Sequence, residues 1–408
     1  MMILSIAWKN IWRNRTRSLI VIVSITLGLI GSLFSIAMMV GMSEERVKNI
    51  INNEISHIQI HHKKYHENRE LKYTITNIEK ITHTLDTTKS IKAYTTRSKA
   101  TAMIRTAATG AGITVVGIDP DKEKKVTGIS ELISDSSGSY FNTKMRYPVV
   151  IGQKIAEKLK VHLRSKIIIQ LQGADGSITG GAFRVAGIFR SNNTMFEERN
   201  LFVQKSDLAK IVGIPQNATH EIAIILHDKE NLSTTKKSLQ SLFPDKEIKT
   251  WKKIQPDLAL ITDFMNLMML LFMSIIMLAL GFGIVNTMLM VVMERIKEIG
   301  MLMAIGMNKS RVFFMIMLET VFLSLTGGVI GMVLSYGLIA VFQTHGLNLS
   351  SVSKGLESFG YASYVYPALN NIFYFYITIL MIFTGIIASI YPALKALKYN
   401  PVDALRTG

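Results

Sequence analysis

The chain has 408 residues, no cysteine, and 46 Lys and Arg against 29 Asp and Glu. Hydrophobic residues make up 49% of it, a share that soluble proteins also reach, so their distribution is more informative than their total. Uncharged apolar runs far longer than a globular helix occur near the start and in the last third, which excludes a purely soluble protein. Residues 43–257 hold 34 Lys and Arg and 23 Asp and Glu, which excludes a protein that lies wholly in the membrane. The absence of cysteine excludes a disulfide framework, a thiolate metal site and a cysteine nucleophile.

Four segments are long and apolar enough to cross a bilayer, which takes about 20 helical residues. They are residues 19–42, 264–293, 312–342 and 372–394, and Glu319 is the one charged residue among them. The first segment is longer than the apolar part of a signal peptide and lacks an Ala-x-Ala cleavage site. We therefore interpret it as an uncleaved membrane anchor.

The short loops between these spans orient the chain. If the N-terminus is cytosolic, residues 1–18, 294–311 and 395–408 are inside, and these segments hold 11 Lys and Arg. The outer loop 343–371 holds only Lys354, which is the asymmetry of the positive-inside rule. The sequence thus predicts a multi-pass membrane protein with both termini in the cytosol. Residues 3–17 either form a short helix in the inner interface or are a basic flank with Trp anchors.

Residues 43–257 are enough for an independent core, and their pattern predicts a mixed α+β extracytoplasmic (periplasmic) domain between the first two spans. Residues 43–53 continue the first span as a helical stalk, residues 153–161 and 206–212 have helical patterns, and Pro256 marks a break before the second span. A hairpin turn is expected at Asp175-Gly176. Strand-like runs occur at residues 55–60, 113–118, 148–151, 166–171, 182–189, 201–203 and 221–226. The predicted fold class is therefore an α-helical membrane protein with four spans and one large inserted α+β domain.

Two features of this domain suggest ligands without specifying them. A cluster of four histidines, His57, His61, His62 and His66, lacks a nearby acid to complete a metal site, so we predict none. The net positive charge of the domain suits anionic lipid headgroups or an acidic partner, but a merely solvated basic surface is the better explanation.

No enzyme motif is present. The sequence has no Gly-Lys dipeptide and hence no P-loop, and it has no nucleophile elbow, zinc-protease or dinucleotide motif. Any ATP and Mg²⁺ must then be bound by a partner.

Glu319 lies two turns into the third span, and we assign it to helix packing or loop tethering rather than proton transfer. The same span carries small residues that predict a seam within the bundle or between two subunits, namely Ser324, Gly327, Gly328, Gly331 and Ser335.

The segment Glu294–Met307 between the second and third spans is the most informative. Ile296, Ile299 and Met303 form an apolar stripe at helical spacing, under a polar face of Glu294, Arg295, Lys297 and Glu298. Such a helix can rest on the membrane bundle and present charge to a soluble partner, but an ordinary juxtamembrane helix has the same pattern.

With its sequence ERIKEIGMLMAIGM, this segment resembles the coupling segment of MacB/LolC/LolE/FtsX-type ABC transporter permeases. The start (AWKNIWRNRTRSL, residues 7–19) and the end (YPALKALKYNPVDALR, residues 391–406) resemble those of the family. So do residues 115–120, 151–159 and 185–188 of the outer domain. Arg164-Ser165-Lys166 departs from it, because the family commonly has a Gly-Asp turn there.

The resemblance implies a dimer of four-span subunits, with a second identical or different permease subunit, bound to a separate cytosolic ABC ATPase dimer. It implies that ATP-driven motion passes through the coupling helix and the spans to the outer domain. The residues that the resemblance assigns to ATPase contact are Glu294, Arg295, Lys297, Glu298, Ile299, Gly300, Met303, Ala304 and Gly306.

Three functions within and beyond this family remain open. The segment Asn53–His61 resembles LolC/LolE-type subunits, which implies release of lipoproteins from the inner membrane, with membrane lipids and a periplasmic carrier as further partners. Export of peptides or drugs by a MacB-type permease is the alternative, although MacB-type proteins usually carry a fused N-terminal ATPase and this sequence begins at the first span. A non-transporting receptor or scaffold is the third. No feature indicates nucleic acid binding.

Overall fold

The computed structural model describes residues 2–13, 15–68, 70–75, 77–106, 109–141, 145–352, 355–356, 360–362 and 364–398. The chain divides into two compact units. The first, the helical unit, comprises Met1–Ser43, Thr262–Asn348 and Tyr364–Gly408. The second, the sheet unit, comprises Glu44–Ile261 and Leu349–Ser363. Each unit has its own hydrophobic core and is described separately below.

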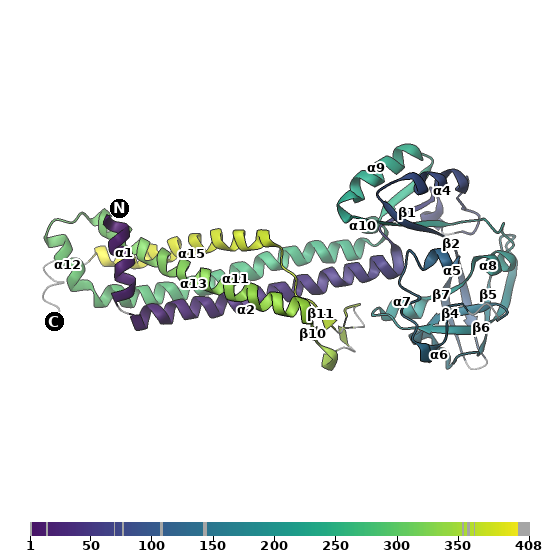
Figure 1. Ribbon diagram of the computed structural model, residues 1–408, viewed down its shortest axis with the longest axis horizontal. Helices are drawn as coiled ribbons and strands as arrows, with labels where there is room; N and C mark the ends of the chain where they lie inside the picture. Colours follow the sequence, from purple (N-terminus) through teal and green to yellow (C-terminus); the bar gives the residue numbers. More distant parts are fainter. Residues whose placement is uncertain are drawn as a thin grey trace. The chain divides into compact units, whose positions relative to one another are not determined.

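Long helices side by side form the helical unit (Figure 1). Among the described residues, four helical segments are apolar and long enough to cross a membrane, which confirms the predicted number of spans and the insertion of a large domain after the first. These segments are Ser18–Ile55, Pro256–Glu294, Lys309–His345 and Asn371–Leu397. The helices are α1 (Met2–Arg13), α2 (Arg15–Ile50), α11 (Pro256–Glu294), α12 (Ile296–Ala304), α13 (Lys309–His345) and α15 (Asn371–Leu397), with a small hairpin of β10 (Leu347–Asn348) and β11 (Tyr364–Val365).

Local sequence explains where these helices begin and end. Asn308 caps α13 by accepting a hydrogen bond from the Ser310 N–H at 3.2 Å, and Asn370 caps α15 in the same way. Pro256 begins α11, at the position where a missing N–H costs nothing. Gly346 ends α13 with φ +69°, a conformation that suits glycine.

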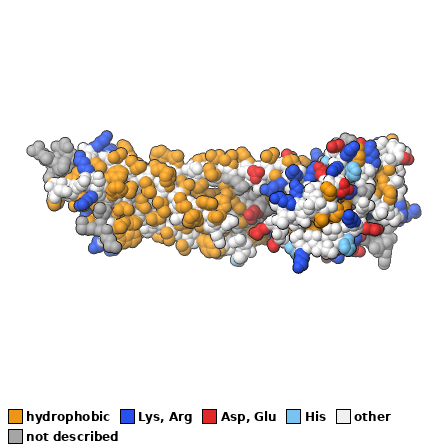
Figure 2. Space-filling view, turned by 90° about the horizontal axis from the view of Figure 1, so that it is seen from above, with side chains coloured by type: hydrophobic (Ala, Val, Ile, Leu, Met, Phe, Trp, Pro, Cys, Tyr) orange, Lys and Arg blue, Asp and Glu red, His pale blue; other side chains and the backbone are white. Residues whose placement is uncertain are grey.

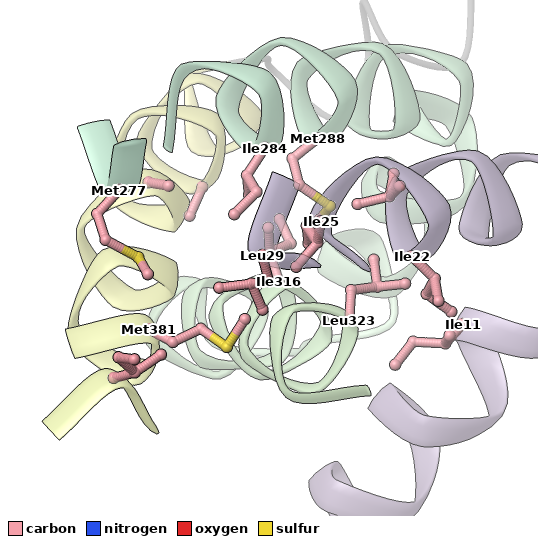
Figure 3. Close-up of a cluster of buried hydrophobic side chains, with 14 of the residues drawn as sticks. Ile11, Ile22, Ile25, Leu29, Met277, Ile284, Met288, Ile316, Leu323 and Met381 are labelled. Carbon is pink, nitrogen blue, oxygen red and sulfur yellow. The ribbon is translucent and has the colours of Figure 1, made fainter. Parts of the chain in front are cut away.

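The interior of the helical unit is apolar, as Figure 3 shows for Ile25, Leu29, Met288 and Leu323. Its exterior is equally apolar, because large side chains such as Phe282 and Leu270 are more than 60% exposed. Hydrophobic side chains cover the helical unit in Figure 2, whereas charged ones gather on the sheet unit. An apolar exterior of this extent is typical of a surface that faces lipid.

The sheet unit is built on nine strands. They are β1 (Ile58–His62), β2 (Ile91–Arg105), β3 (Gly110–Ile118), β4 (Pro148–Gly152), β5 (Lys166–Gln172), β6 (Ile178–Phe189), β7 (Asn200–Gln204), β8 (Glu221–Leu226) and β9 (Lys246–Thr250). The α-helices of this unit are α3 (Tyr65–Asn68), α4 (Ile78–Thr87), α5 (Pro120–Glu123), α6 (Gln153–Leu159), α7 (Thr194–Arg199), α8 (Lys205–Val212), α9 (Leu232–Leu242) and α10 (Trp251–Ile254).

The long strand β2 belongs to two sheets. Its second half, from Ser98 to Arg105, pairs with β3, and β3 continues through β7, β4, β6 and β5 back to β2. These six strands therefore close into a barrel, filled by side chains such as Val115, Ile169 and Phe183. The first half of β2 pairs with β8, and β8, β1 and β9 complete an open sheet whose core includes buried residues of α4 and α9. The α+β character of the domain is thereby confirmed.

The seven predicted strands are all present, but some bounds differ. β3 and β6 begin earlier than predicted, at Gly110 and Ile178. β1 begins at Ile58 rather than at residue 55, because Ile51–Ile55 form a π-helical turn that continues the stalk helix α2. The predicted helices at 153–161 and 206–212, the stalk at 43–53 and the break at Pro256 are observed as α6, α8, the end of α2 and the start of α11. The hairpin turn is also confirmed, with Gly176 at φ +83° between β5 and β6.

Two strands of the sheet unit were not predicted, β2 and β9, and the short strands β10 and β11 of the helical unit were not predicted either. The first half of β2 lacks an apolar alternation because Thr95, Arg97 and Ser98 are buried polar residues. β9 is short and contains Lys246 and Lys249. In both strands, pairing with neighbours prevails over weak intrinsic strand preference.

Arg164, where the sequence departs from the family's glycine turn, adopts φ +66°. A non-glycine residue in this left-handed region is disfavoured by about 1–2 kcal/mol. We expect Arg164→Gly to raise the stability of the sheet unit by about 0.5–1 kcal/mol. Glycine relieves the strain of the positive φ, but part of this gain is offset because glycine makes the unfolded chain more flexible. Trp251 is the only Trp of this unit, so its fluorescence in a Trp8→Phe, Trp12→Phe background measures unfolding of this unit in the full chain.

Lys158→Gly is the matched control, since Lys158 lies within α6 and is exposed. It should lower stability by about 1 kcal/mol. A loss of stability for Arg164→Gly as well would show that the positive φ imposes no strain.

Candidate functional site

The segment between α11 and α13 forms a sharp corner. Arg295 separates α11 from α12 with φ −98° and ψ +17°, and Gly306 turns the chain toward α13 with φ +101°. Ile299 and Gly300 of α12 are buried, and Met303 is half-buried against the core of the helical unit. The apolar stripe predicted for this helix therefore faces the bundle.

The outer side of the corner is exposed. Glu294, Lys297, Ala304 and Gly306 all belong to it. Sequence reasoning did not include two large apolar side chains that are also exposed there, Met301 at 51% and Ile305 at 79%. The run from Met301 to Gly306 could have revealed them, because it is too apolar for one helix to bury on a single face. We call the exposed residues Glu294, Lys297, Met301, Ala304, Ile305 and Gly306 the corner surface.

The structure divides the predicted polar face, because Arg295 points inward and Glu298 forms ion pairs with Arg13 and Arg295 of the same chain. The Arg295 Nη1 lies 3.1 and 3.0 Å from the two carboxylate oxygens of Glu319, and its Nε donates to Glu298 at 3.1 Å. Arg295 therefore has a structural role in the corner. Its charge is paired within the chain, whereas Lys297 is exposed.

Two residues of α1 complete this arrangement. The side-chain amide of Asn10 donates to Glu319 at 2.5 Å, and Arg13 forms an ion pair with Glu298. We call Asn10, Arg13, Arg295, Glu298 and Glu319 the charged cluster. It joins α1, α12 and α13, and it borders a cavity of about 250 Å³. The cavity is lined by Asn10, Ile11, Arg13, Ser18, Met288, Val291, Glu294, Arg295, Glu298, Glu319 and Leu323.

Glu319 is 4% exposed and occupies an apolar helix, where an isolated carboxylate is costly. Arg295 and Asn10 offset that cost by supplying charge and hydrogen bonds. These contacts correspond to the loop-tethering role predicted for Glu319. Asn10 was missed, although it lies on α1 beside Ile11 and one turn from Ala7, both of which are buried.

The small residues of α13 pack within the chain. A Cβ atom added at Gly327 would lie 3.0 Å from the Ile25 Cβ of α2, and one at Gly331 would lie 3.1 Å from Leu29. Thr26 reinforces this contact by donating to the Gly327 carbonyl at 3.1 Å. The sequence left open whether this seam lies within the bundle or between two subunits. The contacts of Gly327 and Gly331 lie within the bundle of one chain.

The opposite side of α13 faces α15. A Cβ atom at Gly328 would overlap the sulfur of Met381, and one at Gly385 would lie 3.0 Å from the Ser324 hydroxyl. Ser324 and Ser335 are themselves buried and donate to carbonyls one turn earlier in α13. Helix α13 thus lies between α2 and α15 with close backbone approach on both sides.

Two histidines of the predicted cluster, His57 and His61, have structural environments. His61 is buried and hydrogen-bonds to the His220 carbonyl and to Gln59, both at 2.9 Å. Burial lowers its pKa to about 3, so the ring is neutral. His57 accepts from the Leu226 N–H at 3.2 Å, which ties β1 to β8. Among the residues that the structure describes, no group of three His, Asp or Glu side chains could hold a metal ion.

Two family matches span most of the chain. Residues 18–242 match the family described as MacB-like periplasmic core domain, and residues 270–401 match the FtsX-like permease C-terminal family. Over 429 aligned residues the chain is 24% identical to an uncharacterized ABC transporter permease of Methanocaldococcus jannaschii, covering 99% of this chain and 97% of that protein.

Exporters are also among the relatives. The chain is 27% identical over 282 residues to the pyoverdine export ATP-binding/permease protein PvdT of Pseudomonas syringae, covering 66% of this chain and 39% of that protein. It is 35% identical over 127 residues to the macrolide export ATP-binding/permease protein MacB of Chlorobium luteolum, covering 30% and 16%. The chain thus spans less than half the length of these exporters. The crystal structure of the periplasmic region of MacB from Actinobacillus actinomycetemcomitans aligns with 53% of this chain and 98% of that chain at 14% identity, with a TM-score of 0.36.

The Arg295–Glu319 pair can be tested by a double-mutant cycle in the purified full chain. Arg295→Met and Glu319→Leu should each lower stability by roughly 3 kcal/mol, because each leaves a buried charge without its partner. The double variant should lose much less, since both charges are removed together. Heat stability in detergent, followed by the monodisperse elution peak, measures the effect.

Lys297→Met is the control, because Lys297 undergoes the same loss of charge at an exposed position. It should leave heat stability unchanged. Additive losses in the double variant would mean that the two charges do not stabilise each other.

Proposed function

The chain belongs to the MacB-like and FtsX-like permeases of ABC transporters, and we propose that it passes the motion of a separate cytosolic ATPase dimer to its sheet unit. The proposal places the chain in the cytoplasmic membrane, with both termini and the corner surface in the cytosol. ATP and Mg²⁺ bind to the ATPase, since the sequence has no P-loop. A second permease subunit completes the assembly.

One observation carries this proposal: the corner has an exposed mixed surface and an interior that is fixed to the bundle. Ile305 is 79% exposed in a segment that lies outside the spans, where an apolar side chain favours burial by a protein partner. Lys297 provides charge beside it. The buried side, through Arg295 and Glu319, connects the same corner to α13.

Motion can then travel along rigid elements. A push on α12 reaches α13 through Arg295, and reaches α1 through Glu298 and Arg13. The candidate span Ser18–Ile55 has 38 residues, or about 57 Å of helix, against a hydrocarbon core of about 30 Å. The excess length is a stalk that continues without a break into the sheet unit.

We propose export as the activity, because the named relatives are exporters of a macrolide and of pyoverdine. The substrate class is then an amphiphilic small molecule or peptide taken up on the outer side of the membrane. Release of lipoproteins to a periplasmic carrier is the alternative, supported by the resemblance of Asn53–His61 to LolC/LolE-type subunits.

The ATPase contact is tested by copurification. Lys297→Glu combined with Ile305→Asp should lower recovery of the ATPase at least about tenfold, since even 1.4 kcal/mol of lost contact has that effect. Lys9→Glu, an exposed charge reversal on α1, should not lower it. Full recovery with the corner variant would exclude this surface as the ATPase site.

The substrate class is tested by depleting the chain in cells. Under the export proposal, depletion raises sensitivity to macrolides and related amphiphiles, while mature lipoproteins are sorted normally. Drug sensitivity measurements and membrane fractionation distinguish the two outcomes. Accumulation of mature lipoproteins in the inner membrane, with unchanged drug sensitivity, would favour lipoprotein release instead.

A further inference from the structure

The stalk enters the sheet unit through the π-helical turn Ile51–Ile55, whose carbonyl groups are held by other segments. The Gly128 N–H donates to the Asn52 carbonyl at 3.2 Å, and the Arg97 Nη1 donates to the Glu54 carbonyl at 3.1 Å. The carbonyl groups of a π-helical turn point in a different direction from those of an α-helix, and such turns often occur at functional positions. Here it allows the end of the stalk to be fixed by two separate elements.

The side chain of Glu54 makes a third connection. Its carboxylate accepts a hydrogen bond from the side-chain amide of Asn193 at 2.7 Å. The carbonyl oxygen of the same amide caps α7 by accepting from the N–H groups of Met195 and Phe196. Both ends of the Asn193 amide are thus used, and its orientation is fixed by the network.

Two of these partners belong to the layer that covers the barrel. Gly128 precedes Ile129, which packs with Ile118 of β3 and Phe202 of β7. Asn193 begins α7, which packs on β3, β4 and β7. The stalk's apolar residues Ile50, Ile51 and Ile55 pack with Ala223 and Ile225 of β8, in the open sheet, and with Val126, two residues before Gly128. The turn therefore contacts both the open sheet and the layer that covers the barrel.

The third partner, Arg97, lies where β2 passes from one sheet to the other. Arg97 is opposite Glu221 at the end of the β2–β8 pairing, and Ser98 begins the pairing with β3. Its guanidinium is 2.7 Å from Glu123 and 2.7 Å from Glu221, and all three side chains are buried. This buried ion-pair network makes the junction between barrel and open sheet rigid.

We propose that the turn Ile51–Ile55 is a clamp by which the stalk controls the barrel, with Glu54 and Asn193 as the positioning residues of that connection. The inference deepens the proposed function, because it assigns the point at which a displacement of the stalk enters the outer domain. When the clamp is closed, the barrel follows the stalk. When the Glu54–Asn193 bond is lost, the connection to α7 is lost, and the turn keeps only the backbone contacts with Gly128 and Arg97 and its apolar contacts.

The burial of Glu54 agrees with a specific role. Burial raises the pKa of this carboxyl to about 7, although the Asn193 hydrogen bond and the Arg46 charge oppose the shift. An apolar side chain would fill the same position without that cost. The carboxyl at this position therefore serves the hydrogen bond to Asn193 rather than packing.

Distance measurements between spin labels test the clamp, since the chain has no native cysteine to remove. One pair joins the stalk to the barrel (Lys48→Cys and Lys158→Cys), and the other joins the stalk to the open sheet (Lys48→Cys and Lys237→Cys). In the full chain, in lipid nanodiscs and without nucleotide, both pairs should give one narrow distance. Glu54→Ala should broaden the stalk–barrel distance and leave the stalk–sheet distance unchanged.

Two further variants separate the clamp from general loosening. Asn193→Ser keeps a capping residue for α7 but removes the amide donor, so it should have the same effect as Glu54→Ala. Glu54→Gln keeps an acceptor oxygen and should preserve both distances, as should Glu44→Ala at an exposed stalk position. Unchanged distances in Glu54→Ala and Asn193→Ser, or broadening of both pairs, would overturn the clamp.

The same samples distinguish this inference from the proposed function. Because the distances are measured without an ATPase, they report the clamp alone. Adding the ATPase and ATP should then shift the stalk–barrel pair of the unmodified clamp as a single population. If the clamp variants broaden the distance but the ATPase neither binds nor changes any distance, the clamp stands and the proposed function fails.

Discussion

A carboxylate buried in an apolar helix must be paired, and this constraint organises the helical unit. Glu319 cannot face lipid at an acceptable cost, so it determines the positions of Arg295 and Asn10. Arg295 in turn fixes the corner between α11 and α12, and Glu298 attaches Arg13 of α1 to the same network. One acid in the third span therefore holds three separate chain segments in register.

Close backbone packing extends this rigidity away from the charged cluster. Gly327 and Gly331 bring α13 against α2, and Gly328 brings it against α15. Since α2 continues from the bundle through the stalk to the π-helical turn, the contacts of α13 and those of Glu54 lie along one continuous stretch of helix. The two buried carboxyls, Glu319 and Glu54, have comparable roles. Glu319 connects α13 to Asn10 and Arg295, and Glu54 connects the stalk to Asn193.

Much of this architecture is predictable because it depends on local patterns. Span lengths, the stalk, the Pro256 break and the glycine turn at residue 176 all follow from composition and spacing. Strand β2 and the inward orientation of Arg295 do not, because they depend on partners far away in sequence: Glu221 for Arg97, and Glu319 for Arg295. The same limit applies to Asn10, whose partner is 309 residues away. A buried polar residue can be identified from sequence as unusual, but its partner cannot.

The strand order has a consequence for how the chain behaves during synthesis. Because β3 returns to β2, the barrel has no terminal strand. In the part of the chain that the structure describes, the open sheet ends at the first half of β2 on one side and at β9 on the other. Strand β9 has five residues and carries Lys246, Glu247 and Lys249. A short, charged edge is a poor template for another polypeptide. The β9 edge is thus protected from edge-to-edge aggregation during synthesis.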